Sequence, residues 1–248
     1  MGGAKSAFQT TDWSEIRNAK TLDEARRKEI VGSLLRKYWK PVYCYLRRKG
    51  YSNELAKDLT QGFFYEIVLG RELIQQADQA KGKFRTFLLT ALDRYVTDTH
   101  RIATAKKRMP IDPMEQMGAI ELPNLPIGQT NAKPEQVFYY AWAADLLDEV
   151  HCKVRNEYCS TGKSIHWQVF REKVLDPIIQ NTKAPSLAEI CTKYGIESED
   201  KASNLIITVK RRYRTVLKRC LRQFVQSDSE VEEEFNELIN ILSKSSAG

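Results

Sequence analysis

Hydrophobic positions recur at three- and four-residue steps along most of this chain. This spacing is typical of amphipathic helices, which turn about 100° per residue. No stretch alternates apolar and polar residues with hairpin turns, as surface strands do. The sequence therefore predicts an all-α protein. The first series approaches Pro41, where the pattern closes or restarts: Ile16, Ala25, Ile30, Leu34, Leu35, Tyr38 and Trp39.

A second helix is expected over residues 54–69, with Ser52 or Asn53 as its N-cap. Projection of this helix separates two groups of side chains. One group is apolar and typical of a core: Leu55, Leu59, Phe63 and Ile67. The other group is acidic or polar, and we call it the docking stripe: Glu54, Asp58, Gln61 and Tyr65. An acidic stripe in a basic chain is a candidate binding surface.

A third helix is predicted from Phe84 to about Arg108. Its apolar side is the expected core face: Phe84, Phe87, Leu88, Ala91 and Tyr95. Its polar side offers hydrogen-bonding and cationic groups: Arg94, Thr97, Asp98 and Arg101. Aromatic residues at this spacing are more often core than ligand contacts, so the polar side is the candidate binding face.

Residues 109–134 contain five of the eight prolines and little periodicity, as expected of a flexible linker. Helical patterns resume at Val137. The predicted organisation is therefore a helical domain over 1–108, a proline-rich linker over 109–134, a second helical domain over 135–226 and an acidic helix over 227–248.

The second domain contains a helix-turn-helix pattern. Ser186 and Glu189 have the spacing of a capping box, and Gly195 is placed to end the first helix in a left-handed conformation. Ser198 is the expected cap of a longer basic helix. The inner side of that helix is predicted to be apolar: Ala202, Leu205, Val209, Tyr213, and Val216 or Leu217.

The distribution of charge favours a polyanion as the partner. The net charge is +7, and basic residues gather in two zones, with eight Lys or Arg in 81–108 and eight in 200–222. The tail from 227 to 248 has six acidic residues and one lysine. Two basic zones about a hundred residues apart, together with the acidic tail, suggest a polyanion gripped at two points.

Other functional classes find little support. No nucleophile motif, phosphate loop or metal-ligand spacing is present, so the chain is not expected to be an enzyme or to need a cofactor or metal. The five cysteines form no CxxC pair and are expected to be reduced thiols. Apolar runs are far shorter than the roughly 18 residues of a membrane span, which favours a cytoplasmic protein without membrane contact.

Two long segments carry a family resemblance: YWKPVYCYLRRKGYSNELAKDLTQGFFYEIV and GKFRTFLLTALDRYVTDTHRIATAKKR. They resemble region 2 of bacterial RNA polymerase sigma factors, in the DLTQ-containing branch of the extracytoplasmic-function (ECF) class. KPEQVFYYAWAADLLDEV, the helix-turn-helix and SEVEEEFNELINIL extend the resemblance over nearly the whole chain. It implies a factor that binds core polymerase, through its beta-prime and beta subunits, and directs promoter recognition.

The resemblance assigns roles to three groups of residues. Core polymerase is expected to bind Glu54, Asp58, Gln61, Phe64 and Tyr65. The minus-ten promoter element is expected to meet Arg94, Thr97, Asp98 and Arg101. The minus-thirty-five element is expected to meet Ser198, Lys201, Ser203, Asn204, Lys210, Arg211, Arg212 and Arg214. Within the last group, Lys201, Ser203 and Asn204 are expected at base edges and the arginines at phosphates.

Several alternatives stay open. Lys57 stands where many ECF factors have an acid, and Glu197 lengthens the turn by one residue, which makes the register of the recognition helix uncertain. The linker acids Asp112, Glu115 and Glu121 fit either a path toward the polymerase cleft or a plain tether.

The acidic tail either packs on the preceding domain or covers the recognition surface as an inhibitor. An anti-sigma factor or a kinase is a further regulatory partner that such a protein could have. The competing function is a helix-turn-helix DNA-binding regulator that acts without joining the polymerase.

Overall fold

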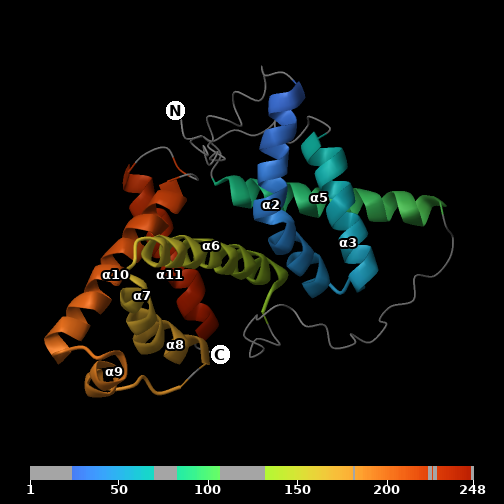
Figure 1. The fold of residues 1–248 in the computed structure, drawn as a ribbon. Coiled ribbons are helices and arrows are strands. Elements are labelled where there is room, and N and C mark those ends of the chain that lie inside the picture. The colour runs from blue at the N-terminus through green and yellow to red at the C-terminus, as the bar shows by residue number, and fades with distance from the viewer. Residues whose placement is uncertain are drawn as a thin grey trace. The chain divides into compact units, whose positions relative to one another are not determined.

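The computed structural model describes residues 24–69, 83–106, 132–180, 182–222, 225 and 228–246, and every regular element in these ranges is helical (Figure 1). The all-α prediction is confirmed for this part of the chain. The helices fall into two compact units. The first unit comprises Met1–Asp145 with Arg222–Gly248, and the second comprises Leu146–Leu221.

The first unit contains α2 (Glu24–Arg48), α3 (Asn53–Gly62), the π-helical segment η1 (Phe63–Leu69), α5 (Phe84–Lys106), the beginning of α6 (Pro134–Ser160) and α11 (Asp228–Ser246). Aromatic rings join these helices in one core. The ring of Tyr38 stacks on Phe138 of α6 at 6.5 Å and meets the edge of Phe84 of α5 at 5.6 Å. Such contacts stabilise the fold beyond the burial of their area.

Helix α2 continues through Pro41, contrary to the expectation that the periodicity closes or restarts there. Proline removes one backbone donor and normally destabilises a helix interior. Here Pro41 is buried and lies between the fully buried side chains of Tyr38 and Val42. Tertiary packing on both sides of the proline therefore offsets the local cost.

The second unit contains the remainder of α6, α7 (Ser164–Phe170), the π-helical segment η3 (Arg171–Leu175), α8 (Asp176–Gln180), α9 (Leu187–Tyr194) and α10 (Glu199–Leu221). Its core is also partly aromatic. The imidazole of His151 meets the ring of Trp167 edge-on at 4.7 Å, and Phe170 lies 6.0 Å from Tyr213 of α10. The first contact holds α7 against α6, and the second holds α10 against α7.

The units divide the chain at other positions than the predicted domain limits. The first unit extends into α6 as far as Asp145, and it also takes in the C-terminal helix α11. Most of the predicted linker, 109–131, lies outside the described residues. The first unit is thus assembled from both ends of the chain, with the second unit inserted between them.

None of the helices in the described ranges combines the length and the apolar character needed to cross a membrane.

Candidate functional site

The docking stripe begins at a well-formed helix N-terminus. The Ser52 hydroxyl accepts a hydrogen bond from the backbone N–H of Leu55 at 3.3 Å, so Ser52, rather than Asn53, is the N-cap of α3. The cap satisfies one of the donors that a helix N-terminus leaves unpaired. It thereby fixes where the helix begins and which side chains face outward.

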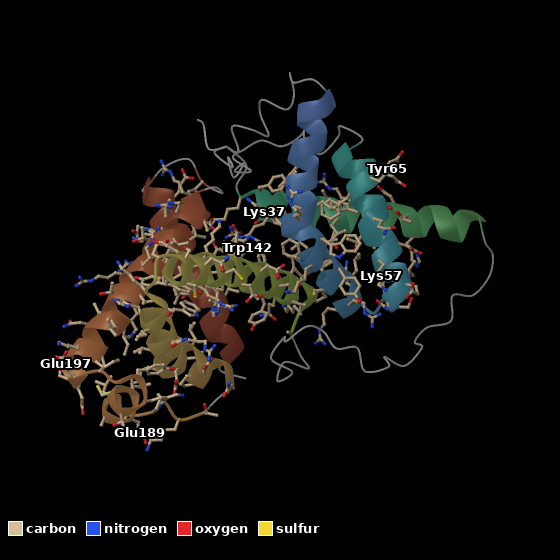
Figure 2. All side chains as sticks on the ribbon, in the orientation of Figure 1. Lys37, Lys57, Tyr65, Trp142, Glu189 and Glu197 are labelled. Carbon is tan, nitrogen blue, oxygen red and sulfur yellow. The ribbon has the colours of Figure 1, made fainter. Side chains whose placement is uncertain are left out.

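All four side chains of the docking stripe are exposed: Glu54, Asp58, Gln61 and Tyr65. Figure 2 shows Tyr65 projecting from the far end of this helical stretch, with Lys57 on the same stretch. Tyr65 is 73% exposed, which is unusual for so large a ring. Asp58 and Gln61 have no hydrogen-bond or ion-pair partner among the described residues, so their polar groups are available to another molecule.

Two residues near the stripe differ from the expectation. Phe64, an expected polymerase contact, is 2% exposed, and its ring packs against Phe63 at 5.5 Å. Leu55, an expected core residue, is 46% exposed. The reason is that the buried face of α3 is centred on Ala56 and Leu59, which places Leu55 about a quarter-turn outside it.

Phe64 turns inward where α3 passes into η1. In a π-helix each hydrogen bond spans five residues, so successive side chains are rotated less than in an α-helix. Phe63 and Phe64 both enter the core as a result. The exposed apolar neighbours of Asp58 are therefore Leu55 and Tyr65, and Phe64 supports the surface from below.

Gly62 lies where α3 comes close to the Tyr95 side chain of α5. A Cβ atom at this position would lie 2.3 Å from the Tyr95 hydroxyl oxygen and 3.5 Å from the ring carbon that bears it. The first distance is far below van der Waals contact. The glycine therefore lets the helix that carries the docking stripe approach α5 closely.

The polar side of α5 is also exposed, as its periodicity predicts. Arg94, Thr97 and Asp98 face solvent, while Tyr95 and Val96 are buried. The Thr97 hydroxyl donates to the carbonyl of residue 93 at 2.8 Å. The side chain of Arg101, the fourth expected minus-ten contact, lies outside the described residues.

The beginning of α5 holds a buried charge cluster that the sequence patterns did not indicate. A guanidinium nitrogen of Arg85 lies 2.5 Å from Glu234 of α11 and another lies 2.8 Å from Glu237. The Lys83 ammonium lies 2.6 Å from Glu234 and also pairs with Glu237. The side chains of Arg85 and Glu234 are 3% and 2% exposed. We call these four residues the charge cluster.

The charge cluster is neutral overall and is closed by an aromatic ring. The Arg85 guanidinium carbon lies 4.5 Å from the ring centre of Trp142 on α6. Burial acts to lower the pKa of Arg85, but Glu234 and Glu237 outweigh it, and the net shift is upward. The apolar seam of α11 is buried at Val231 and Leu238. The tail helix is thus an integral part of the first unit.

The helix-turn-helix caps form as the sequence predicts. The Ser186 hydroxyl accepts from the N–H of Glu189 at 3.1 Å, and the Glu189 carboxylate accepts from the N–H of Ser186 at 2.6 Å. Gly195 adopts a left-handed conformation with φ 64°, and the Ser198 hydroxyl accepts from the N–H of residue 201 at 3.3 Å. Figure 2 labels Glu189 in the first turn of α9 and Glu197 in the turn that precedes α10.

Helix α10 separates into a buried and an exposed side. The buried side is apolar: Ala202, Ile206, Val209, Val216, Leu217, Cys220 and Leu221. Most of the expected DNA contacts are exposed: Ser198, Lys201, Asn204, Lys210, Arg211 and Arg214. Ser203 is half-buried, at the edge of this face.

Two of the expected contacts already have partners within the second unit. Arg212 donates to one oxygen of Glu157 on α6 through Nε at 2.9 Å and a terminal nitrogen at 2.7 Å. This contact engages two of the three guanidinium nitrogens of Arg212 and holds α10 on α6. The Lys201 ammonium pairs with Glu197, the residue that lengthens the turn.

The histidines and cysteines in and just after α6 form no candidate metal site among the described residues. Among the described residues no three His, Cys, Asp or Glu side chains are grouped in a way that could hold a metal ion. His151 and His166 pack on aromatic rings, and burial lowers the pKa of both.

Comparison of the chain with protein-family models, with curated proteins and with solved structures finds no match.

Proposed function

We propose that this chain is a sigma factor of the ECF class, which binds bacterial core RNA polymerase through the docking stripe and brings it to promoter DNA. The observation that carries the proposal is the exposed surface around Asp58. A carboxylate and an amide that have no partner among the described residues, Asp58 and Gln61, lie between two exposed apolar side chains, Leu55 and Tyr65. A basic partner with an apolar patch would be complementary to this surface in both charge and hydrophobicity.

The chemistry of this surface suits a basic helical partner. The Asp58 carboxylate can accept a charge-assisted hydrogen bond from Arg or Lys, and Gln61 can donate and accept beside it. Tyr65 supplies a large rigid ring of the kind that anchors interfaces. Lys57 lies 3.6 Å from Glu54, which leaves the charge of Asp58 as the dominant one at the centre of the stripe.

The two basic zones are the proposed contacts with promoter DNA. The exposed Arg94, Thr97 and Asp98 of α5 are the proposed contacts of the first unit with the minus-ten element. The exposed side of α10 is the proposed contact of the second unit with the minus-thirty-five element, because a recognition helix with lysines and arginines on its outer side fits the major groove.

The test is direct binding to purified bacterial core polymerase, followed by promoter-directed transcription. We expect the wild-type chain to co-elute with the core enzyme and to start transcripts at defined sites. Asp58→Arg should abolish co-elution while the helical content and melting temperature stay unchanged. Glu233→Arg is the matched control, because it makes the same change in charge at an exposed position of α11.

Unchanged co-elution of the Asp58→Arg variant would refute the docking stripe. The competing function, a DNA-binding regulator that acts alone, shares the α9–α10 hairpin but has no use for the stripe. Sequence-selective DNA binding without any association with core polymerase would favour that alternative.

A further inference from the structure

The most outward-facing line of side chains on α10 includes an exposed isoleucine. Residues four, seven and eleven positions apart follow one line along an α-helix. On α10 this line, which we call the reading stripe, consists of Asp200, Asn204, Ile207 and Arg211. All four are exposed, and Ile207 is 41% exposed.

The fold does not account for an isoleucine at this position. The buried side of α10 is filled by other side chains, including the neighbours Ile206 and Val209. A β-branched residue on the solvent side of a helix gains little burial and loses side-chain rotational freedom. Single exposed apolar residues are common, so the surroundings decide whether Ile207 has a role.

Those surroundings match a DNA duplex. Asn204 lies about one turn before Ile207, and Arg211 lies about one turn after it. Lys210 and Arg211, three and four positions after Ile207, are exposed on either side of it, where they can reach phosphates. In the major groove the thymine 5-methyl group is the apolar feature that a side chain can contact. An isoleucine flanked by an amide and cationic groups fits that environment.

We propose that Ile207 is a specificity-determining residue that contacts a thymine methyl in the DNA bound by α10. This inference rests on the proposed function and deepens it. It also assigns the base contacts to the reading stripe and no longer to Lys201 and Ser203. Lys201 pairs with Glu197, and Ser203 is half-buried at the edge of the exposed face. Asn204 keeps its predicted role at base edges.

The experiment begins by selecting duplexes from a randomised pool with the full-length chain, alone and bound to core polymerase. Each thymine of the enriched sequence is then replaced singly by deoxyuridine, which lacks only the methyl group. We expect one replacement to weaken binding of the wild-type chain about fourfold, the effect of removing one apolar carbon from a contact. The Ile207→Ala variant should be insensitive to the same replacement, whereas Ile207→Val should stay sensitive.

Ile165→Ala is the matched control, because Ile165 is 46% exposed on α7 of the same unit. This variant should keep the wild-type response to deoxyuridine. If a sequence is enriched but no thymine shows a methyl effect, or if Ile207→Ala shows the same effect as the wild type, the inference is overturned and the proposed function stands. If neither preparation enriches any sequence, promoter recognition by α10 is overturned together with the inference.

Discussion

Replacing Glu234 with glutamine removes the negative charge that Arg85 and Lys83 share inside the first unit. Arg85 is only 3% exposed, so water cannot replace the lost interaction. Removing one partner of a buried ion pair costs about 3–5 kcal/mol. We expect the lower end, about 3 kcal/mol, because Glu237 stays 2.8 Å from the guanidinium and the Trp142 ring lies 4.5 Å from it.

Urea and thermal unfolding followed by tryptophan fluorescence can measure this loss. Trp167 is the only tryptophan of the second unit, so a Trp167→Phe background restricts the signal to the first unit. A loss of about 3 kcal/mol should lower the melting temperature by roughly 6–12 °C. Glu233→Gln is the control, since its exposed carboxylate should change stability by less than about 0.5 kcal/mol.

A Glu234→Gln variant whose unfolding free energy stays within about 0.5 kcal/mol of the wild-type value would contradict this expectation. A second variant separates charge from packing. Arg85→Met combined with Glu234→Leu removes both buried charges and leaves Lys83 and Glu237 to pair with each other. This double variant should recover most of the lost stability. A double variant as unstable as Glu234→Gln would show that the loss comes from packing.

Three further predictions concern other contacts. Gly62→Ala should lower the melting temperature of the first unit, although alanine favours helices. Adding Tyr95→Phe to the same chain should restore the melting temperature, because the nearest remaining ring carbon is 3.5 Å from the new Cβ. Thermal melting of both variants tests this. Hydrogen bonds from a lysine and a tyrosine of α9 lower the pKa of Glu172 in the folded protein. The ionised carboxylate therefore stabilises the fold above the unfolded pKa of about 4.3, and this stabilisation is lost as the pH falls through the lower folded pKa. Glu172→Gln should therefore melt earlier than the wild type near neutral pH, and melting curves recorded at successively lower pH should converge. Arg212→Ala should cost about 1 kcal/mol of unfolding free energy, because the contact with Glu157 is lost. The salt dependence of DNA binding should stay unchanged. If the slope of log binding constant against log salt concentration falls by about one unit, Arg212 contacts a phosphate.

Local features of the structure were predictable from the sequence. The capping box at Ser186, the left-handed Gly195 and the cap at Ser198 depend on residues within four positions of one another, and all three form as expected. Phe64 was misplaced because a regular helical projection does not anticipate the π-helical segment that turns it inward. The periodicity also failed at Leu55, which lies beside the buried face of the regular helix α3.

The charge cluster lay beyond such reasoning because its partners are far apart in the sequence. Arg85 and Glu234 are separated by 149 positions. In the sequence, Glu234 and Glu237 look like ordinary members of an acidic surface. The available signal was their three-residue spacing beside the apolar seam of α11, but nothing local identifies the cations that they meet. For the same reason, the sequence left the role of the tail open between packing and inhibition.

The assembly of the first unit from both ends of the chain has a consequence during protein synthesis. The second unit is continuous in sequence and can fold as soon as it leaves the ribosome. The first unit must wait for α11, which follows α5 by about 120 residues, or roughly 6–24 s of translation. Until then Arg85 and Lys83 lack their carboxylates, and the surface that α11 covers is open to chaperones and proteases. If translation stops before α11, the N-terminal part of the first unit therefore lacks the helix that completes its packing, although that part has been fully synthesised.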